Sequence, residues 1–306
     1  MTAEFPKQVT LREVGPRDGF QNVAAFIPTE GKLKVIKSLA EAGLREIEVT
    51  SFINAKVVPQ LADAEAIMTG LAAEGFIRSV LVPTPKYAMS AIEAGADQLV
   101  VFLSASEGHN RANVNRSVPE SLAGLDTIFS LAADQGVPVV GAIATSFGCP
   151  YDGDVPTDNV LTICAHFRDF GADGIILGDT TGMAMPPAVT HLVKSYQDRF
   201  SAADMTLHFH NNRGTAMSNL YAALQAGAAR FDTALGGIGG CPTVPQAAGN
   251  LATEDVVCLL HEMGIETGVD LDRLITAARD MEELLGYALP GQVMKSGPID
   301  WHAGAT

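Results

Sequence analysis

The chain has 306 residues, of which 47% are hydrophobic and 18% charged, a composition typical of a globular protein and unlike that of a disordered chain. It carries 35 acidic and 20 basic side chains, a net charge of −15, which argues against a protein that follows nucleic-acid phosphates. No run of 18 apolar residues suggests a transmembrane helix. We therefore expect neither nucleic acid nor a membrane as a partner.

The cysteines and the N-terminus indicate a cytoplasmic protein. Cys149, Cys164, Cys241 and Cys258 form no CxxC pair, so neither a zinc ribbon nor a disulfide framework is predicted. The first ten residues, MTAEFPKQVT, lack the apolar or Arg-rich segment of a targeting peptide.

Short β-branched runs alternate along the chain with longer segments of helical spacing. The strands are predicted at 9–14, 46–49, 77–82, 98–103, 138–144, 174–177, 206–210 and 230–235. Their starts advance by about 32 residues, the length of one βα unit. Eight units in strict alternation predict an α/β fold of the (β/α)8 TIM-barrel type. A doubly wound sheet is the alternative, but its Gly-rich fingerprint is missing after the first strand.

One further helix is predicted at 271–285, after the eighth unit. We expect a catalytic barrel over 1–270 and a C-terminal helix and tail over 271–306 that pack on it. The tail from 290 carries little pattern, so we expect it to be loosely held.

In such a barrel the chemistry lies at the C-terminal ends of the strands. The first strand ends in EVGPRDG, which sets Arg17 beside Asp18 between glycines. This pair suits a metal-binding carboxylate next to a cation that polarises a carbonyl group, or a salt-bridged turn. In the second strand, Glu46 and Glu48 share one face. If that face is the barrel interior, Glu48 needs a partner, and Arg17 is the obvious one; the alternative is a solvated rim.

The seventh strand, LHFHN, gives the strongest local signal. A period of two places His208 and His210 on one face, with Leu207 and Phe209 packing outward. Two imidazoles at a barrel mouth are typical of a metal site.

Three further segments leave alternatives open. The glycine-rich GGIGGCP loop fits a phosphate cradle, a mobile lid carrying Cys241, or a flexible surface loop. Asn250 fits a neutral oxygen ligand or a helix N-cap. Asp179, which ends the sixth strand, fits a general base, an orienting residue or an Asx-turn.

Together these motifs resemble the 3-hydroxy-3-methylglutaryl-CoA lyase family over about residues 9–274. The matching segments include EVGPRDGFQN, EIEVTSF, SASEGHNRANVNRS, GCPYDG, LGDTTGMAMP, HFH and GGIGGCP followed by GNLATEDVV. The RDG motif belongs to a wider group of metal-dependent barrel lyases and acyl-CoA Claisen enzymes, whereas GGCP followed by GNLATED points to the lyase branch.

The resemblance implies a carbon–carbon lyase that splits 3-hydroxy-3-methylglutaryl-CoA into acetyl-CoA and acetoacetate by a retro-Claisen-type reaction. It implies a divalent metal, Mg²⁺ or Mn²⁺, a homodimer, and the following site residues. The metal ligands are Asp18, His208, His210 and Asn250; the catalytic residues are Arg17 at the enolate oxygen, His208 in proton transfer, the lid thiol Cys241, and Asp179; the residues near the substrate are Gln21, Glu48, Asn113 and Ala142.

Two departures from the family pattern leave the 3-substituent of the substrate open. Ala142 and Ala144 stand where the family tends to carry Tyr and Ser, and NNRG at 211–214 replaces an Asp followed by Thr-Tyr-Gly. A lyase for a bulkier 3-alkyl homologue is therefore an alternative, as is a Claisen synthase or aldolase of the same group. A non-catalytic barrel fits the combined motifs less well.

Overall fold

The structure is a computed structural model that describes residues 5–72, 75–240 and 249–300. Its strands pair in parallel in chain order and close into a barrel, β8 against β1. The strands are β1 (Thr10–Glu13), β2 (Glu46–Ser51), β3 (Ile77–Leu81), β4 (Gln98–Ser104), β5 (Val139–Ala144), β6 (Gly174–Asp179), β7 (Met205–Phe209) and β8 (Arg230–Thr233). The predicted (β/α)8 barrel is confirmed.

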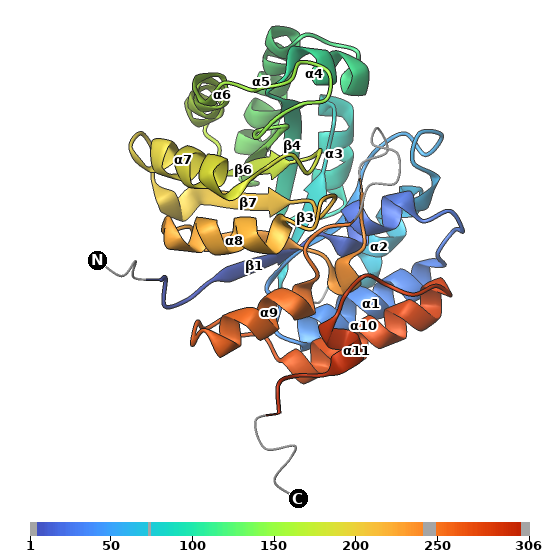
Figure 1. The fold of residues 1–306 in the computed structure, drawn as a ribbon. Helices are drawn as coiled ribbons and strands as arrows, with labels where there is room; N and C mark the ends of the chain where they lie inside the picture. The colour runs from blue at the N-terminus through green and yellow to red at the C-terminus, as the bar shows by residue number, and fades with distance from the viewer. Residues whose placement is uncertain (1–4, 73–74, 241–248, 301–306) are drawn as a thin grey trace, which may run out of the picture.

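Helices follow the strands and surround the barrel (Figure 1). They are α1 (Thr29–Glu41), α2 (Ala64–Gly70), α3 (Pro85–Glu93), α4 (Glu107–Val114), α5 (Val118–Gln135), α6 (Thr157–Asp169), α7 (Pro186–Gln197), α8 (Ala216–Gln225), α9 (Thr253–Glu262), α10 (Leu271–Leu285) and α11 (Val293–Ser296). Over the described residues, none of these helices is long and apolar enough to cross a membrane.

The strands separate two apolar clusters because successive side chains point to opposite faces. On β4, Leu99, Val101 and Leu103 belong to the large core between strands and helices. Val100 belongs instead to a small cluster inside the barrel, against which Phe102 packs. The other members of the small cluster are Leu81, Val140 and Ile176, with Ala142 also packed against it. This cluster forms an apolar floor inside the barrel.

A buried carboxyl group joins the first and last strands at the barrel seam. Glu13 Oε1 accepts hydrogen bonds from the backbone N–H groups of Gly15 and Leu235, both at 2.9 Å. Its Oε2 accepts one from Thr253 Oγ1 at 2.6 Å. Burial raises the pKa of Glu13 to about 7 despite these bonds. Glu13 thus holds the turn after β1 against the segment after β8.

The C-terminal helix α10 lies beside α1 (Figure 1), where Lys34 Nζ donates to Asp280 at 2.9 Å. The expectation of a loosely held tail from 290 is wrong for its first residues. Gly291 N donates to Gly236 O at 2.9 Å, and Val293 N donates to Asp255 at 2.7 Å. Met294 is buried, so α11 belongs to the packed structure.

Candidate active site and metal centre

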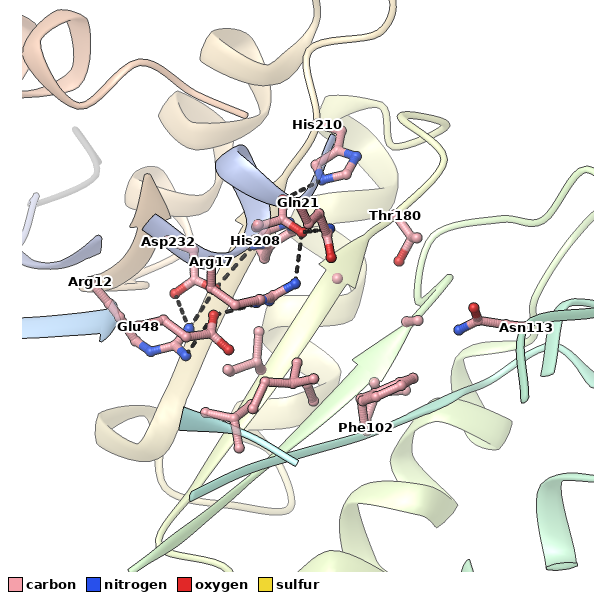
Figure 2. Close-up of a pocket in the computed structure, with 18 of the residues that line it drawn as sticks. Arg12, Arg17, Gln21, Glu48, Phe102, Asn113, Thr180, His208, His210 and Asp232 are labelled. Atoms are coloured by element: carbon pink, nitrogen blue, oxygen red, sulfur yellow. Dashed lines mark hydrogen bonds and ion pairs between the residues drawn. The ribbon is translucent and has the colours of Figure 1, made fainter. Parts of the chain in front are cut away.

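A cavity opens at the carboxyl ends of the strands, where the barrel fold places chemistry. Figure 2 shows its charged side chains gathered on one side and Asn113 across from them. Nine residues singled out from the sequence line this one cavity: Arg17, Asp18, Gln21, Glu48, Asn113, Ala142, Ala144, His208 and His210. The closed barrel therefore brings together residues that are up to 193 positions apart in the chain, as between Arg17 and His210.

Asp18, His208 and His210 form a candidate metal centre. One ligand atom from each residue lies within 4.8 Å of the others. His208 lies in β7 and His210 directly follows the strand, with ring centroids 4.9 Å apart, while Leu207 and Phe209 are fully buried in the outer core. The predicted facing of these four side chains is confirmed.

The donor atoms of this cluster are available to a cation. Both ring nitrogens of His210 are buried without a hydrogen-bond partner among the described residues. Burial lowers the pKa of His210, which keeps the ring neutral and its lone pair free. Burial opposes ionisation of Asp18 as well, but the Arg17 guanidinium holds the pKa of that carboxyl well below its usual range. One carboxylate and two imidazoles suit a divalent ion.

Asn250 stands beside Asp18, brought there by the loop that follows β8. Asn250 Nδ2 donates to Asp18 Oδ2 at 2.8 Å, and its Oδ1 has no partner in the described part of the chain. Gly239 allows this approach, since its φ is +132° and a Cβ there would lie 2.3 Å from Asn250 Nδ2. The amide nitrogen is thus the atom of Asn250 that faces Asp18, and Asn250 itself is not among the residues that line the cavity.

Arg17 reaches across the cavity wall between two carboxylates. Its Nη1 donates to Asp18 at 2.8 Å and its Nη2 to Glu48 at 3.0 Å, so the Arg17–Glu48 pairing predicted from the sequence is present. The Nε of Arg17 and the Oε1 of Glu48 have no partner among the described residues. Gln21 Nε2 donates to Asp18 at 2.8 Å. The arginine is therefore held firmly next to the candidate metal position.

Two residues that the sequence reasoning missed lie behind His208. Asp232 Oδ2 is 3.0 Å from His208 Nδ1, and both carboxylate oxygens accept hydrogen bonds from Arg12 Nη1 at 2.9 and 3.0 Å. Arg12 also lies 3.1 Å from Glu48. The sequence does carry a signal for them: Arg12 lies within β1 and Asp232 within β8, and a charged side chain in a buried strand needs a buried partner of opposite charge. With Nδ1 engaged by Asp232, Nε2 is the nitrogen left to a metal.

Two further expected residues stand apart from this arrangement. Asp179 does not line the cavity; its Oδ1 accepts hydrogen bonds from Met183 N at 2.7 Å and Ala184 N at 3.0 Å. This arrangement favours the turn-forming alternative, and burial raises the pKa of Asp179 to about 7. Cys241 falls in 241–248, outside the described residues.

Fold and site together define a (β/α)8-barrel enzyme with a candidate metal centre at its strand ends. Residues 8–281 match the HMGL-like family, and the chain belongs to that family.

Full-length relatives agree with this assignment. The chain is 43% identical to hydroxymethylglutaryl-CoA lyase of Bacillus subtilis, covering 95% of this chain and 99% of the relative. It is 40% identical to (R)-citramalyl-CoA lyase of Chloroflexus aurantiacus, covering 95% of each. Among solved structures, an HMG-CoA lyase from Acinetobacter baumannii in complex with coenzyme A and 3-methylmalate superimposes with a TM-score of 0.93 at 40% identity, covering 96% of this chain and 97% of that one.

Proposed function

We propose that this chain is a metal-dependent carbon–carbon lyase that cleaves 3-hydroxy-3-methylglutaryl-CoA into acetyl-CoA and acetoacetate. The observation that carries the proposal is the Asp18–His208–His210 cluster with Arg17 bonded to its carboxylate, all in one cavity at the strand ends. A relative 43% identical over nearly the whole chain bears the name of this activity.

The donor set would hold a divalent ion through Asp18, His208, His210 and the free oxygen of Asn250. When bound, the ion supplies a Lewis acid that lowers the pKa of the substrate's 3-hydroxyl group. Mg²⁺ and Mn²⁺ suit this mixture of oxygen and imidazole donors without a thiolate. The homodimer implied by the family resemblance, and the cytoplasmic location expected from the cysteines and the N-terminus, belong to the same proposal.

The reaction removes the hydroxyl proton and breaks the C2–C3 bond. The electrons of the O–H bond form the ketone of acetoacetate, and those of the C2–C3 bond pass to the thioester as an enolate. Arg17 offsets the charge that develops on the enolate oxygen, in the role of an oxyanion hole. His208 takes part in the proton transfer; Asp232, hydrogen-bonded at Nδ1, raises the pKa of the ring against the effect of burial. Protonation of the enolate at C2 then yields acetyl-CoA.

A substrate with a larger 3-alkyl group is the second candidate. Ala142 and Ala144 both line the cavity, and Phe102, which pairs in register with Ala142, lies beside the apolar floor. Small side chains at these two positions leave room for additional methylene groups. The relative named (R)-citramalyl-CoA lyase, at 40% identity, supports variation of the acyl group within this barrel.

The test is a panel of 3-hydroxyacyl-CoA thioesters, scored for acetyl-CoA release with protein stripped by EDTA and then reloaded with Mg²⁺ or Mn²⁺. We expect no turnover after chelation and recovery with either ion. His210→Gln should lose bound metal, whereas His191→Gln on the exposed side of α7 should retain it. Full activity in exhaustively chelated protein would refute the metal requirement, and no acetyl-CoA from any thioester would refute the lyase.

A further inference from the structure

A third histidine, which the mechanism above does not use, lines the same cavity. His109 lies on α4, just after β4, and its side chain is 1% exposed. Asn113, one helical turn further along α4, also lines the cavity. Figure 2 places Asn113 on the side of the cavity away from Arg17 and His208. His109 thus belongs to the wall opposite the candidate metal centre.

Hydrogen bonds fix the position of the His109 ring. Ser104 Oγ, at the end of β4, lies 2.5 Å from His109 Nδ1. Ser104 N donates to Asn110 Oδ1 at 3.0 Å, and His109 N donates to Ser106 Oγ at 3.2 Å. Side-chain and backbone bonds therefore fix both the ring and the helix that carries it.

A chain of hydroxyl groups continues from the ring into the end of β5. Ser104 Oγ lies 3.3 Å from Thr145 Oγ1, and the Thr145 hydroxyl donates to Ala144 O at 2.7 Å. Thr145 has a φ of +57°, a strained conformation for a β-branched residue that persists where the surroundings require it. The Ser104 hydroxyl can either donate to Nδ1 or accept from it, so Nε2 can serve as a donor or as an acceptor.

Nε2 of His109 is buried and has no hydrogen-bond partner among the described residues. Burial also lowers the pKa of this histidine, so the ring is neutral. A buried polar atom without a partner destabilises the protein unless a ligand supplies the missing bond. Its place in the cavity wall indicates that the ligand is the one bound in the cavity.

We propose that His109 Nε2 forms a hydrogen bond with the cysteamine amide N–H of the bound acyl-CoA, the polar group that follows the thioester along the CoA arm. Ser104 is the positioning residue that orients the ring for this contact. The inference rests on the proposed function: the substrate hydroxyl and the thioester carbonyl, whose oxygen becomes the enolate oxygen, lie on the side of Asp18 and Arg17. The opposite wall then meets the next polar group along the CoA arm, the cysteamine amide.

Three variants test whether the hydrogen bond of His109, and not only the shape of its ring, contributes to activity. His109→Phe keeps an aromatic ring but removes Nε2, His109→Gln keeps a polar group of similar reach, and Ser104→Ala removes the orienting hydroxyl. His191→Phe, an exposed position on α7, is the matched control. We expect His109→Phe to lower kcat/KM by about ten- to a hundred-fold, the loss for an unpaired polar contact. His109→Gln and Ser104→Ala should fall between it and the wild type, with metal content and Tm unchanged in all of them.

A truncated substrate tests the amide contact. A simple S-ethyl thioester of the same acyl group keeps the carbonyl oxygen and lacks the cysteamine amide. The defect of His109→Phe should vanish on this substrate while it remains on the CoA thioester. A defect that persists on the S-ethyl thioester, or a kcat/KM within twofold of the wild type on the CoA thioester, overturns the inference.

Calorimetric measurement of acetyl-CoA binding distinguishes a failure of the proposed function from a failure of the His109 contact. A wild-type protein that cleaves no acyl-CoA but binds acetyl-CoA about tenfold more tightly than His109→Phe would refute the proposed function and support the His109 contact. An active wild type that His109→Phe equals in both binding and turnover would support the function and refute the contact.

Discussion

Replacing Asp232 by asparagine should reduce metal affinity although Asp232 is not itself in the proposed ligand set. The carboxylate accepts from Arg12 Nη1 with both oxygens and also bonds His208 Nδ1. An asparagine has one oxygen, and Arg12 has only donors, so the amide oxygen must face Arg12. The amide NH₂ group then faces Nδ1 and favours the tautomer with the proton on Nε2. A protonated Nε2 cannot bind a metal.

Loss of such a carboxylate behind a histidine ligand lowers metal affinity or activity by about 10- to 100-fold. The assay is a calorimetric titration of the apoprotein with Mn²⁺, followed by kcat at saturating metal. The matched control is Asp97→Asn, at the opposite end of the barrel. It alters another bidentate pair, in which Arg78 donates to the two carboxylate oxygens of Asp97 at 2.7 and 2.9 Å. If Asp232→Asn and Asp97→Asn both bind Mn²⁺ within twofold of the wild type, the tautomer argument is wrong.

Three other predictions follow from the site and the seam. Arg17→Gln should lower kcat by about 10²–10³-fold, the cost of one oxyanion donor, and a change in KM alone would reduce Arg17 to a binding residue. Burial raises the pKa of Glu13 from 4.5 to about 7, so the folded state binds this proton more tightly than the unfolded chain, and the resulting stability is lost as pH rises across that range. The Tm of the wild type should therefore fall relative to Glu13→Gln between those two pH values, and a constant difference would contradict the shift. Ala142→Tyr should shift kcat/KM toward the methyl substrate over longer 3-alkyl homologues, by about tenfold for every two methylenes excluded; equal preference in both proteins would show that the space is filled from elsewhere.

The fold could be predicted closely because the barrel repeats one simple pattern. Every predicted strand coincides with an observed one, with ends that differ by a few residues. The facing of His208 and His210 followed from the period of two in LHFHN, and the pairing of Glu48 with Arg17 from the cost of an unpaired buried charge.

The layer behind the ligands could not be predicted in the same way. The contact of Arg12 with Asp232 spans 220 residues and depends on how β1 and β8 align at the seam. Spacing along the chain carries no information about that register. The packing of residues 290–297 against Gly236 and Asp255 depends likewise on tertiary contacts, because those residues show no periodic pattern of their own.

The bond between Asn250 and Asp18 has a consequence for biosynthesis, since it joins residues 232 positions apart. During synthesis the chain emerges from its N-terminal end, so Asp18 leaves the ribosome long before β7, β8 and the loop that carries Asn250. A nascent chain that ends before residue 208 contains this carboxylate without either histidine, and one that ends before residue 250 still lacks the amide. The complete proposed ligand set therefore forms only after the last strand has paired with the first, and metal binding should report the completion of the barrel.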